Sequence, residues 1–381
     1  MKIALVSPYD FAHPGGVQSG HIAALERQLT KMGHEVKVIA PSSGPIDYLG
    51  DRFIQIGKPR SIPSSGSVVR ISISLRLASR IKEVLEREKF DIVHLHEPFM
   101  IMLCSAVLRY SNSVNIGTFH AADGKPGYQW GWPIGLIILK RRQRKLSGKI
   151  AVSKPAMNYA GKYIPGEYEI IPNGVDTERF TPDVAPMEQY CDGKQNILFL
   201  GRLEHRKGLK YLLEAYRLVK KEIPNSRLIV VGPGTRLRKG YESFVQQNHL
   251  EDVVFVGYIP EEDKPRYFKT ADVYCAPSTG HESQGIVLLE AMAVGTPIVA
   301  SNLEGYAGVV THGQEGLLVP PKNSAELAKA LIFLLRDKSL RQKMGARGRI
   351  TAEQYSWERV ARRVCDYYNK VLSKLPPAPV K

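Results

Sequence analysis

Two acidic residues eight positions apart have types and a spacing suited to a hydroxylated ligand. Glu282 lies before a glycine, Gly285, and Glu290 lies in the apolar stretch that follows, which predicts a helix. In one continuous helix the two carboxylates would be ~12 Å apart along the axis. Placed at the helix start and within its first turns, they could hold hydroxyl groups at two points of one ligand. An acidic helix start with one exposed glutamate is the plainer alternative.

A cluster of cations precedes another predicted helix. Arg202, Arg206 and Lys207 lie between Gly201 and Gly208, directly after an expected strand, and Lys207 is expected to open the helix. Cations at a helix N-terminus oppose the helix dipole, so their presence there favours a bound anion over a structural role. A solvated basic turn is the alternative.

A glycine pair, Gly15 and Gly16, follows the first expected strand and opens a helix. Backbone N–H groups at a helix N-terminus attract phosphate, and glycine allows its close approach. A plain turn is the alternative. The sequence contains neither G-x-G-x-x-G nor G-x-x-x-x-G-K-[ST], which disfavours dehydrogenases and P-loop enzymes.

Three histidines lie at expected strand ends. His94 and His96 bracket the end of a strand at 91–95, and His120 follows a strand at 116–119. Catalytic and binding residues of α/β folds gather at the carboxyl ends of strands. Their spacing fits no common metal-ligand pattern, and the sequence has no Asp-x-Asp handle for a Mg²⁺-diphosphate. We therefore expect no metal.

The elements that must position these residues are short apolar strands alternating with helices, which is typical of parallel sheets. The sequence predicts two doubly wound α/β domains, with a ligand in the cleft between them. The first domain is expected at 1–172, a Pro-, Gly- and Asp-rich linker at 173–195, the second domain at 196–354 and an amphipathic final helix at 355–375. The strands are expected at 2–7, 35–40, 91–95, 116–119, 149–152, 197–200, 227–231, 253–255, 272–275 and 297–300.

Length and composition narrow the class of protein. The 381 residues are 43% hydrophobic and 24% charged, which excludes a wholly disordered chain. The net charge of +16 favours an anionic partner. A nucleic-acid-binding module is one alternative, but no recognisable motif supports it. Four scattered cysteines, no signal-peptide pattern and no apolar run long enough to span a bilayer predict a cytoplasmic protein.

One segment of the first domain has the composition of a membrane anchor. Interfacial aromatics, a short apolar stretch and a polybasic run are what a monotopic anchor needs. A helix buried in the domain with a solvated basic end is the alternative. The expected membrane-contacting residues are Trp132, Lys140, Arg141, Arg142, Arg144 and Lys145, with Arg76 and Arg80 forming a second basic edge.

Several motifs in order along the chain resemble retaining glycosyltransferases of family 4. The motifs are 15–17 (Gly-Gly-Val), 172–176 (Pro-Asn-Gly-Val-Asp), 201–208 and the pair Glu282 and Glu290. The resemblance implies a GT-B fold, with two Rossmann-like domains facing across a cleft and the final helix packing back on the first. It implies transfer of a hexose, with mannose from GDP-mannose favoured over a UDP-hexose, to a membrane lipid such as phosphatidylinositol on the inner face of the cell membrane. No further cofactor and no nucleic acid are implied; an epimerase on the same fold, or another lipid or soluble acceptor, remains open.

The resemblance also implies roles for individual residues. His120 would lie against the sugar and assist transfer, and Glu282 would bind the transferred hexose. The donor would be bound by Gly16, Arg202, Lys207, Gly285, Ile286, Glu290, Ile259, Glu261 and Lys264, and the acceptor head group by Tyr9 and Gln18. The segment 63–67, His281 and Gln284 depart from the family pattern. These departures leave the acceptor and the donor sugar open.

Overall fold

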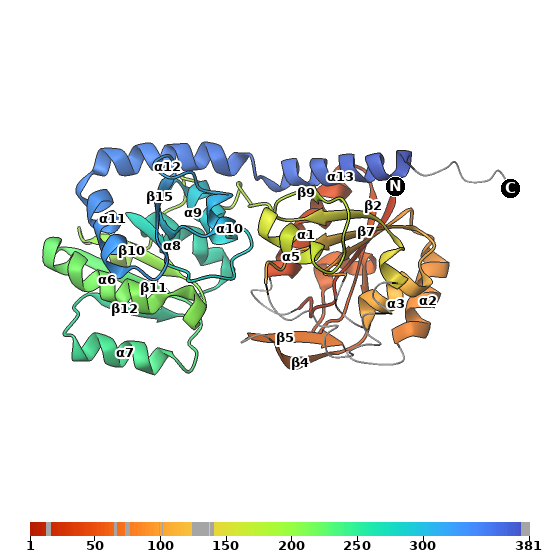
Figure 1. Cartoon of the computed structure of the whole chain (residues 1–381), viewed down its shortest axis with the longest axis horizontal. Coiled ribbons are helices and arrows are strands. Elements are labelled where there is room, and N and C mark those ends of the chain that lie inside the picture. Colours follow the sequence, from red (N-terminus) through yellow and green to blue (C-terminus); the bar gives the residue numbers. More distant parts are fainter. Residues whose placement is uncertain are drawn as a thin grey trace. The chain divides into compact units, whose positions relative to one another are not determined.

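The computed structural model describes residues 1–12, 17–64, 67–72, 77–98, 100, 102–123, 137 and 141–374, with the side chains of 17–19, 63–64 and 67–68 excepted. The chain forms two compact units. The first comprises Met1–Asn173 together with Trp357–Lys381, and the second comprises Gly174–Ser356. Figure 1 shows the course of the chain through both units.

The first unit is built on a parallel sheet, which in the described residues has seven strands. Its helices are α1 (Val17–Lys31), α2 (Leu77–Glu88), α3 (Leu103–Tyr110), α5 (Lys154–Gly161) and α13 (Trp357–Ser373), with a 3₁₀ turn at Asp47–Arg52. The strands, in order across the sheet, are β3 (Phe53–Gln55), β2 (Glu35–Ala40), β1 (Lys2–Val6), β6 (Ile92–His96), β7 (Val114–Phe119), β8 (Leu146–Ala151) and β9 (Glu169–Ile170).

Alternating residues of the central strands fill two cores in this unit. Ile3 and Leu5 of β1 face α1 and α13, whereas Ala4 and Val6 face α2 and α3. This is the alternation that a strand covered on both faces requires. The last helix, α13, therefore belongs to the first unit (Figure 1), which confirms the expectation that it packs back on the first domain.

An antiparallel hairpin was not expected from the sequence. It consists of β4 (Pro59–Ser64) and β5 (Ser67–Ser72) and is separate from the main sheet. Serine, proline and arginine interrupt its valines and isoleucines, so the hairpin lacks the longer apolar runs of the other strands. An isolated bridge joins Tyr9 to Ile71 of β5, so the hairpin lies beside the loop that follows β1.

The second unit contains another parallel sheet, of six strands in the described residues, which confirms the two-sheet prediction. Its strands, in order, are β12 (Val253–Gly257), β11 (Ser226–Val231), β10 (Gln195–Leu200), β13 (Val273–Ala276), β14 (Ile298–Ser301) and β15 (Gly316–Val319). Its helices are α6 (Leu209–Glu222), α7 (Arg238–Gln247), α8 (Lys264–Thr270), α9 (Ile286–Val294), α10 (Glu304–Ala307), α11 (Ser324–Arg336) and α12 (Lys338–Glu353), with 3₁₀ turns at Glu188–Tyr190, His205–Lys207 and Glu261–Asp263.

Residues 174–195, expected to be a linker, are part of the second unit. Val175, Phe180 and Tyr190 are buried in its core, because the aromatic side chains among the prolines and glycines have apolar surface to bury. The second unit therefore begins at Gly174, whereas the sequence predicted that the second domain begins at residue 196.

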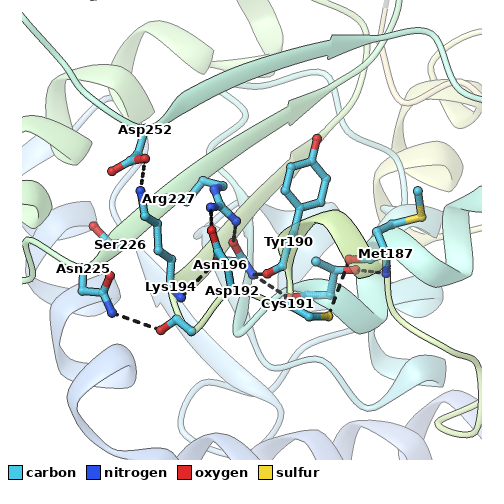
Figure 2. Close-up of polar contacts among 12 residues, drawn as sticks. Met187, Tyr190, Cys191, Asp192, Lys194, Asn196, Asn225, Ser226, Arg227 and Asp252 are labelled. Carbon is cyan, nitrogen blue, oxygen red and sulfur yellow. Dashed lines mark hydrogen bonds and ion pairs between the residues drawn. The ribbon is translucent and has the colours of Figure 1, made fainter.

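A polar network fastens this segment to the sheet (Figure 2). The buried guanidinium of Arg227, at the start of β11, pairs with Asp192 and donates to Asn196 Oδ1 at 3.3 Å. Asn196 in turn donates through Nδ2 to the carbonyl of Tyr190 at 3.0 Å. A buried guanidinium needs such partners, so these contacts hold the segment at the amino ends of β10 and β11, the edge opposite to the strand ends where ligands are expected.

The described residues include no helix that is both long enough and apolar enough to cross a bilayer. All four cysteines are free thiols, and only Cys191 is exposed.

Candidate functional site

Two loops meet at the carboxyl ends of the neighbouring strands β10 and β13 in the second unit. Gly208 has φ 74°, and a Cβ atom there would lie 1.9 Å from the carbonyl oxygen of Pro277. Only glycine permits this approach. The amide of Thr279 donates to the carbonyl of Arg206 at 2.7 Å. These contacts fix the cationic turn against the loop that carries the first of the two acids.

The cations and the acid that the sequence singled out separately are ion-paired. Lys207 Nζ lies 2.6 Å from Glu282 Oε1, and Arg206 Nη1 lies 3.1 Å from the same oxygen. Glu204 pairs with Arg202 at 3.1 Å and with Arg206 at 2.9 Å. The turn is therefore not the unbalanced basic surface that its composition indicated, since two carboxylates lie among its three cations. Lys207 ends a 3₁₀ turn, and α6 begins two residues later.

The second acid lies on α9, directly behind this loop. Gly285 precedes Ile286, the first residue of α9, with φ 78°, and a Cβ atom there would lie 2.7 Å from the ring of Tyr306. Glu290 is 8% exposed, and its Oε2 atom has no hydrogen-bond partner among the described residues. Burial raises the pKa of this carboxyl. A buried, unpartnered carboxylate oxygen is costly without donors, so this position suits a ligand that brings hydroxyl groups.

Two further residues predicted for the donor site, Glu261 and Lys264, lie near Glu290. Lys264, at the start of α8, pairs with Glu261 at 2.7 Å. The positive charge of Lys264 lowers the pKa of Glu290, and the negative charge of Glu261 raises it. Burial has a larger effect on this pKa than either charge. Ile259 is buried in the adjoining core. The structure thus brings the expected ribose-binding and base-binding residues into one neighbourhood.

A cluster of histidines lies at the carboxyl edge of the first unit's sheet. His96 ends β6 and His120 follows β7, and these strands are neighbours. The third member, His21, lies on α1, which follows β1, the strand on the other side of β6. Sequence reasoning missed His21, because only the strand order β1-β6-β7 brings its helix beside the other two. The sequence feature that could have identified His21 is its position near the start of the helix that follows the first strand.

The histidine side chains contact one another closely. His96 Nδ1 lies 3.1 Å from His120 Nε2. The His21 ring lies edge-on to the rings of His96 and His120, with centroids 5.0 and 4.9 Å apart. His21 Nδ1 lies 2.9 Å from Asn173 Oδ1. The ring of His120 is thus held between His96 and His21.

His94 has a different role. Its Nδ1 lies 2.6 Å from the Tyr368 hydroxyl on α13, and its Nε2 lies 2.6 Å from Thr118 Oγ1. Both ring nitrogens are therefore engaged in hydrogen bonds, and His94 ties the last helix to β7. Burial lowers the pKa of His94 to about 3 and that of His21 to about 4. Burial also holds the pKa values of His96 and His120 well below the usual range, so all four rings are neutral at pH 7.

A buried carboxylate anchors the backbone next to the cluster. Glu97 Oε1 accepts from the amides of His120 and Ala121 at 2.7 and 2.8 Å. Burial raises the pKa of Glu97, and these two hydrogen bonds oppose that rise. Tyr9, one of the expected acceptor-binding residues, is partly exposed, and burial of its hydroxyl raises its pKa well above the usual range. Gly16 and the side chain of Gln18 lie outside the described part of the chain.

The expected membrane residues divide into three groups. Arg142 donates to the carbonyl of Ser105 at 2.7 Å and Lys145 to that of Arg109 at 2.9 Å, so both are tied to α3. Arg80, Arg141 and Arg144 are exposed, whereas Arg76, Trp132 and Lys140 lie outside the described residues.

Comparisons with known proteins agree with these features. Residues 14–179 match the family described as Glycosyltransferase Family 4, and residues 189–351 match the family described as Glycosyl transferases group 1. The chain is 36% identical to a phosphatidyl-myo-inositol mannosyltransferase of Mycobacterium tuberculosis over 97% of both chains. It is 26% identical to a GDP-mannose-dependent alpha-(1-6)-phosphatidylinositol monomannoside mannosyltransferase of the same species, over 93% of this chain and 94% of that one.

A solved structure with the same fold is sucrose-phosphate synthase from Thermosynechococcus elongatus. The two superpose with a TM-score of 0.74 over 98% of this chain and 100% of the other, at 23% sequence identity. At that identity the likeness establishes the architecture, and the chemistry has to be argued from the residues described above.

Proposed function

Since the chain belongs to glycosyltransferase family 4, we propose that it transfers mannose from GDP-mannose to phosphatidylinositol at a membrane surface, with retention of configuration. The mannosyltransferase at 36% identity over nearly the whole chain supports the sugar and the lipid. The more distant relative, a GDP-mannose-dependent mannosyltransferase, supports the GDP-linked donor.

The observation that carries the proposal is the arrangement of charges at the carboxyl edge of the second sheet. Arg202 and Lys207 are cations on one turn, Glu282 lies against that turn and Glu290 carries a buried unpartnered oxygen. In the proposed complex the cations hold the diphosphate, Glu282 holds the hexose, and Glu290 accepts from the ribose hydroxyls. Cations provide charge-assisted bonds to phosphate, and carboxylates accept from hydroxyls.

Further donor contacts are assigned to neighbouring positions. Ile259, Glu261 and Lys264 are assigned to the proposed base pocket, which is supported by the charges of Glu261 and Lys264 acting on Glu290. The amides at the start of α9, after Gly285, have no side-chain cap, and we assign the amide of Ile286 to the donor. An uncapped helix N-terminus favours an anionic ligand.

The mechanism follows from where charge develops. When the sugar leaves the diphosphate, negative charge grows on the phosphate oxygens and positive charge on the anomeric carbon. Lys207 and Arg202 stabilise the first, so electrostatic preorganisation and positioning supply most of the rate. The acceptor attacks from the face that the diphosphate leaves, and the leaving phosphate takes the acceptor's proton. His120, held as a neutral imidazole by burial, contacts the sugar and orients it.

The lipid acceptor is assigned to the first unit. Tyr9 and Gln18 are the proposed head-group contacts, and the chain is proposed to act as a peripheral protein on the cytoplasmic face of the membrane. The exposed guanidiniums of Arg80, Arg141 and Arg144 support attraction to an anionic leaflet, where each cation near the surface is worth about 1 kcal/mol.

One experiment tests the proposal directly. The purified chain is incubated with GDP-mannose, UDP-glucose or UDP-galactose and with vesicles that contain phosphatidylinositol, phosphatidylglycerol or neither, and the lipids are identified by mass spectrometry. Mannosylated phosphatidylinositol from GDP-mannose is the expected product. Transfer to another lipid, or from a UDP-sugar alone, would overturn the assignment of acceptor or donor.

A variant separates the chemical role of His120 from a structural one. His120→Ala should lose transfer while the variant still folds, because residue 120 is only partly buried at the end of β7. A large fall in melting temperature together with activity would indicate a core residue instead.

A further inference from the structure

The histidine cluster has one feature that transfer chemistry does not require. One ring nitrogen from each of His21, His96 and His120 lies within 4.8 Å of the others. One pair of nitrogens in this cluster, His96 Nδ1 and His120 Nε2, is 3.1 Å apart. Ligand nitrogens on a tetrahedral zinc ion are about 3.3 Å apart, given Zn–N bonds of about 2.0–2.1 Å. Closing the site therefore requires ring movements of about 1.5 Å at the widest separation.

The state of the side chains suits metal ligation. His96 is fully buried, and its Nδ1 atom lies 3.1 Å from His120 Nε2. Imidazole nitrogens are among the ligands that zinc-class ions prefer. His94 is excluded as a ligand, since hydroxyl groups engage both of its nitrogens.

The surroundings provide the outer contacts that metal-binding histidines usually have. His21 Nδ1 is held by Asn173 Oδ1 at 2.9 Å, which fixes the ring and leaves Nε2 for a ligand bond. Glu97, bound to the amides of His120 and Ala121, places a carboxyl group beside the cluster that can balance a cation's charge. The partial exposure of His120 leaves one side of the cluster open.

We propose that His21, His96 and His120 form a site for a transition-metal ion of the zinc class, and that an ion bound there stops sugar transfer. Three imidazoles without a carboxylate ligand favour Zn²⁺, Co²⁺, Ni²⁺ or Cu²⁺ over Mg²⁺, Ca²⁺ or Mn²⁺. This revises the expectation of no metal, which was based on spacing along the chain. The inhibitory part rests on the proposed function, because it requires the His120 ring to act in transfer.

The binding test uses the full wild-type chain after treatment with a chelator. Titration with Co²⁺ should give the visible absorption of a tetrahedral site with a stoichiometry of one, and Zn²⁺ should abolish it. X-ray absorption of the zinc-loaded chain should count three imidazole ligands without any substitution. Absence of binding, or two or fewer imidazoles, would overturn the site.

Variants locate the ion. His21→Gln, His96→Gln and His120→Gln should each weaken Zn²⁺ binding by more than about a hundredfold, since even partners one shell further out contribute 10- to 100-fold. His249→Asn, an exposed histidine in the second unit, is the matched control and should bind like wild type. Circular dichroism selects the variants that fold, and the partly exposed His120 is the safest to change. Unchanged affinity in any folded cluster variant would overturn the assignment.

The inhibition test is separate. Mannose transfer should fall at least tenfold at one equivalent of Zn²⁺ and return on addition of a chelator. If zinc binds and transfer continues, the inhibitory role is wrong while the site stands. If the metal-free chain transfers no mannose, the proposed function fails, and the binding measurements still decide the metal site.

Discussion

Replacing Glu282 by glutamine should have opposite effects on donor binding and on turnover. The carboxylate pairs with Lys207 at 2.6 Å and Arg206 at 3.1 Å, and it accepts from the Ser278 hydroxyl at 3.1 Å. The proposed diphosphate and the Glu282 carboxylate therefore compete for the same ammonium group. Glu282→Gln keeps the shape of the side chain and removes its charge.

The size of the effect follows from the burial of the pair. The side chains of Lys207 and Glu282 are 19% and 9% exposed, so solvent screens their attraction only in part. A hydrogen bond to a charged group is worth about 1.5–3 kcal/mol, and part of this is retained because the glutamine oxygen still accepts from Arg206. We expect GDP affinity to rise by about 1–2 kcal/mol, which is a factor of about 5–30. Turnover should fall about 10- to 100-fold through the lost contact to the hexose.

Calorimetry with GDP and steady-state transfer of mannose measure the two quantities. Glu242→Gln is the matched control, since Glu242 pairs with Arg238 at 2.7 Å on α7, and it should change neither. A loss of GDP affinity in Glu282→Gln, or an unchanged affinity with normal turnover, would show that the carboxylate does not compete with the diphosphate.

Four further outcomes are expected. Lys207→Ala should weaken GDP binding by about 10- to 100-fold in calorimetry, because a charge-assisted contact is lost; wild-type affinity in the folded variant would remove Lys207 from the site. Glu290→Ala should reduce GDP affinity and transfer together, and a defect in transfer alone would contradict a ribose contact. The pKa of His21 is lowered by burial to about 4, against about 6.5 in an unfolded chain. The free energy of unfolding keeps the full contribution of the neutral His21 ring above pH 6.5. It falls by up to about 3 kcal/mol as the pH drops from 6.5 to 4, because the unfolded chain then binds a proton that the buried ring does not. Urea unfolding across this range should show a smaller loss in His21→Gln, and an equal loss would assign the acid sensitivity to other groups. Replacing the exposed Arg141 and Arg144 with glutamate should release the chain from anionic vesicles and leave GDP affinity intact; sedimentation like wild type would place the anchor elsewhere.

The sheets could be predicted from sequence because their strands are short runs of apolar residues. Lys2–Val6 and Gln195–Leu200 are buried on both faces, and their composition shows it. The β4–β5 hairpin could not be predicted this way, since its serines and prolines carry no such signal. The segment 174–195 was misassigned for a related reason. Its prolines and glycines indicate a linker, whereas Phe180 and Tyr190 are buried in the core.

The candidate site was predictable residue by residue but not in its contacts. Glu282 and Lys207 were each identified from their own motif, yet they are 75 positions apart and no spacing rule pairs them. His21 illustrates the same limit, since its role depends on the order of strands in the sheet. Local motifs therefore identify the residues of the site, whereas the ion pairs among these residues depend on the fold.

The return of α13 to the first unit has a consequence for how the chain is made. The second unit is one continuous stretch, Gly174–Ser356, whereas the first is split and its core includes Trp357, Val364 and Tyr368. On the ribosome the first 173 residues emerge early but lack the helix that covers one face of their sheet, so the later unit is able to finish folding before the earlier one. The Tyr368 contact to His94 forms only after the whole second unit has been synthesised. A chain that stops before Trp357 would leave the apolar surface that α13 covers in the first unit exposed.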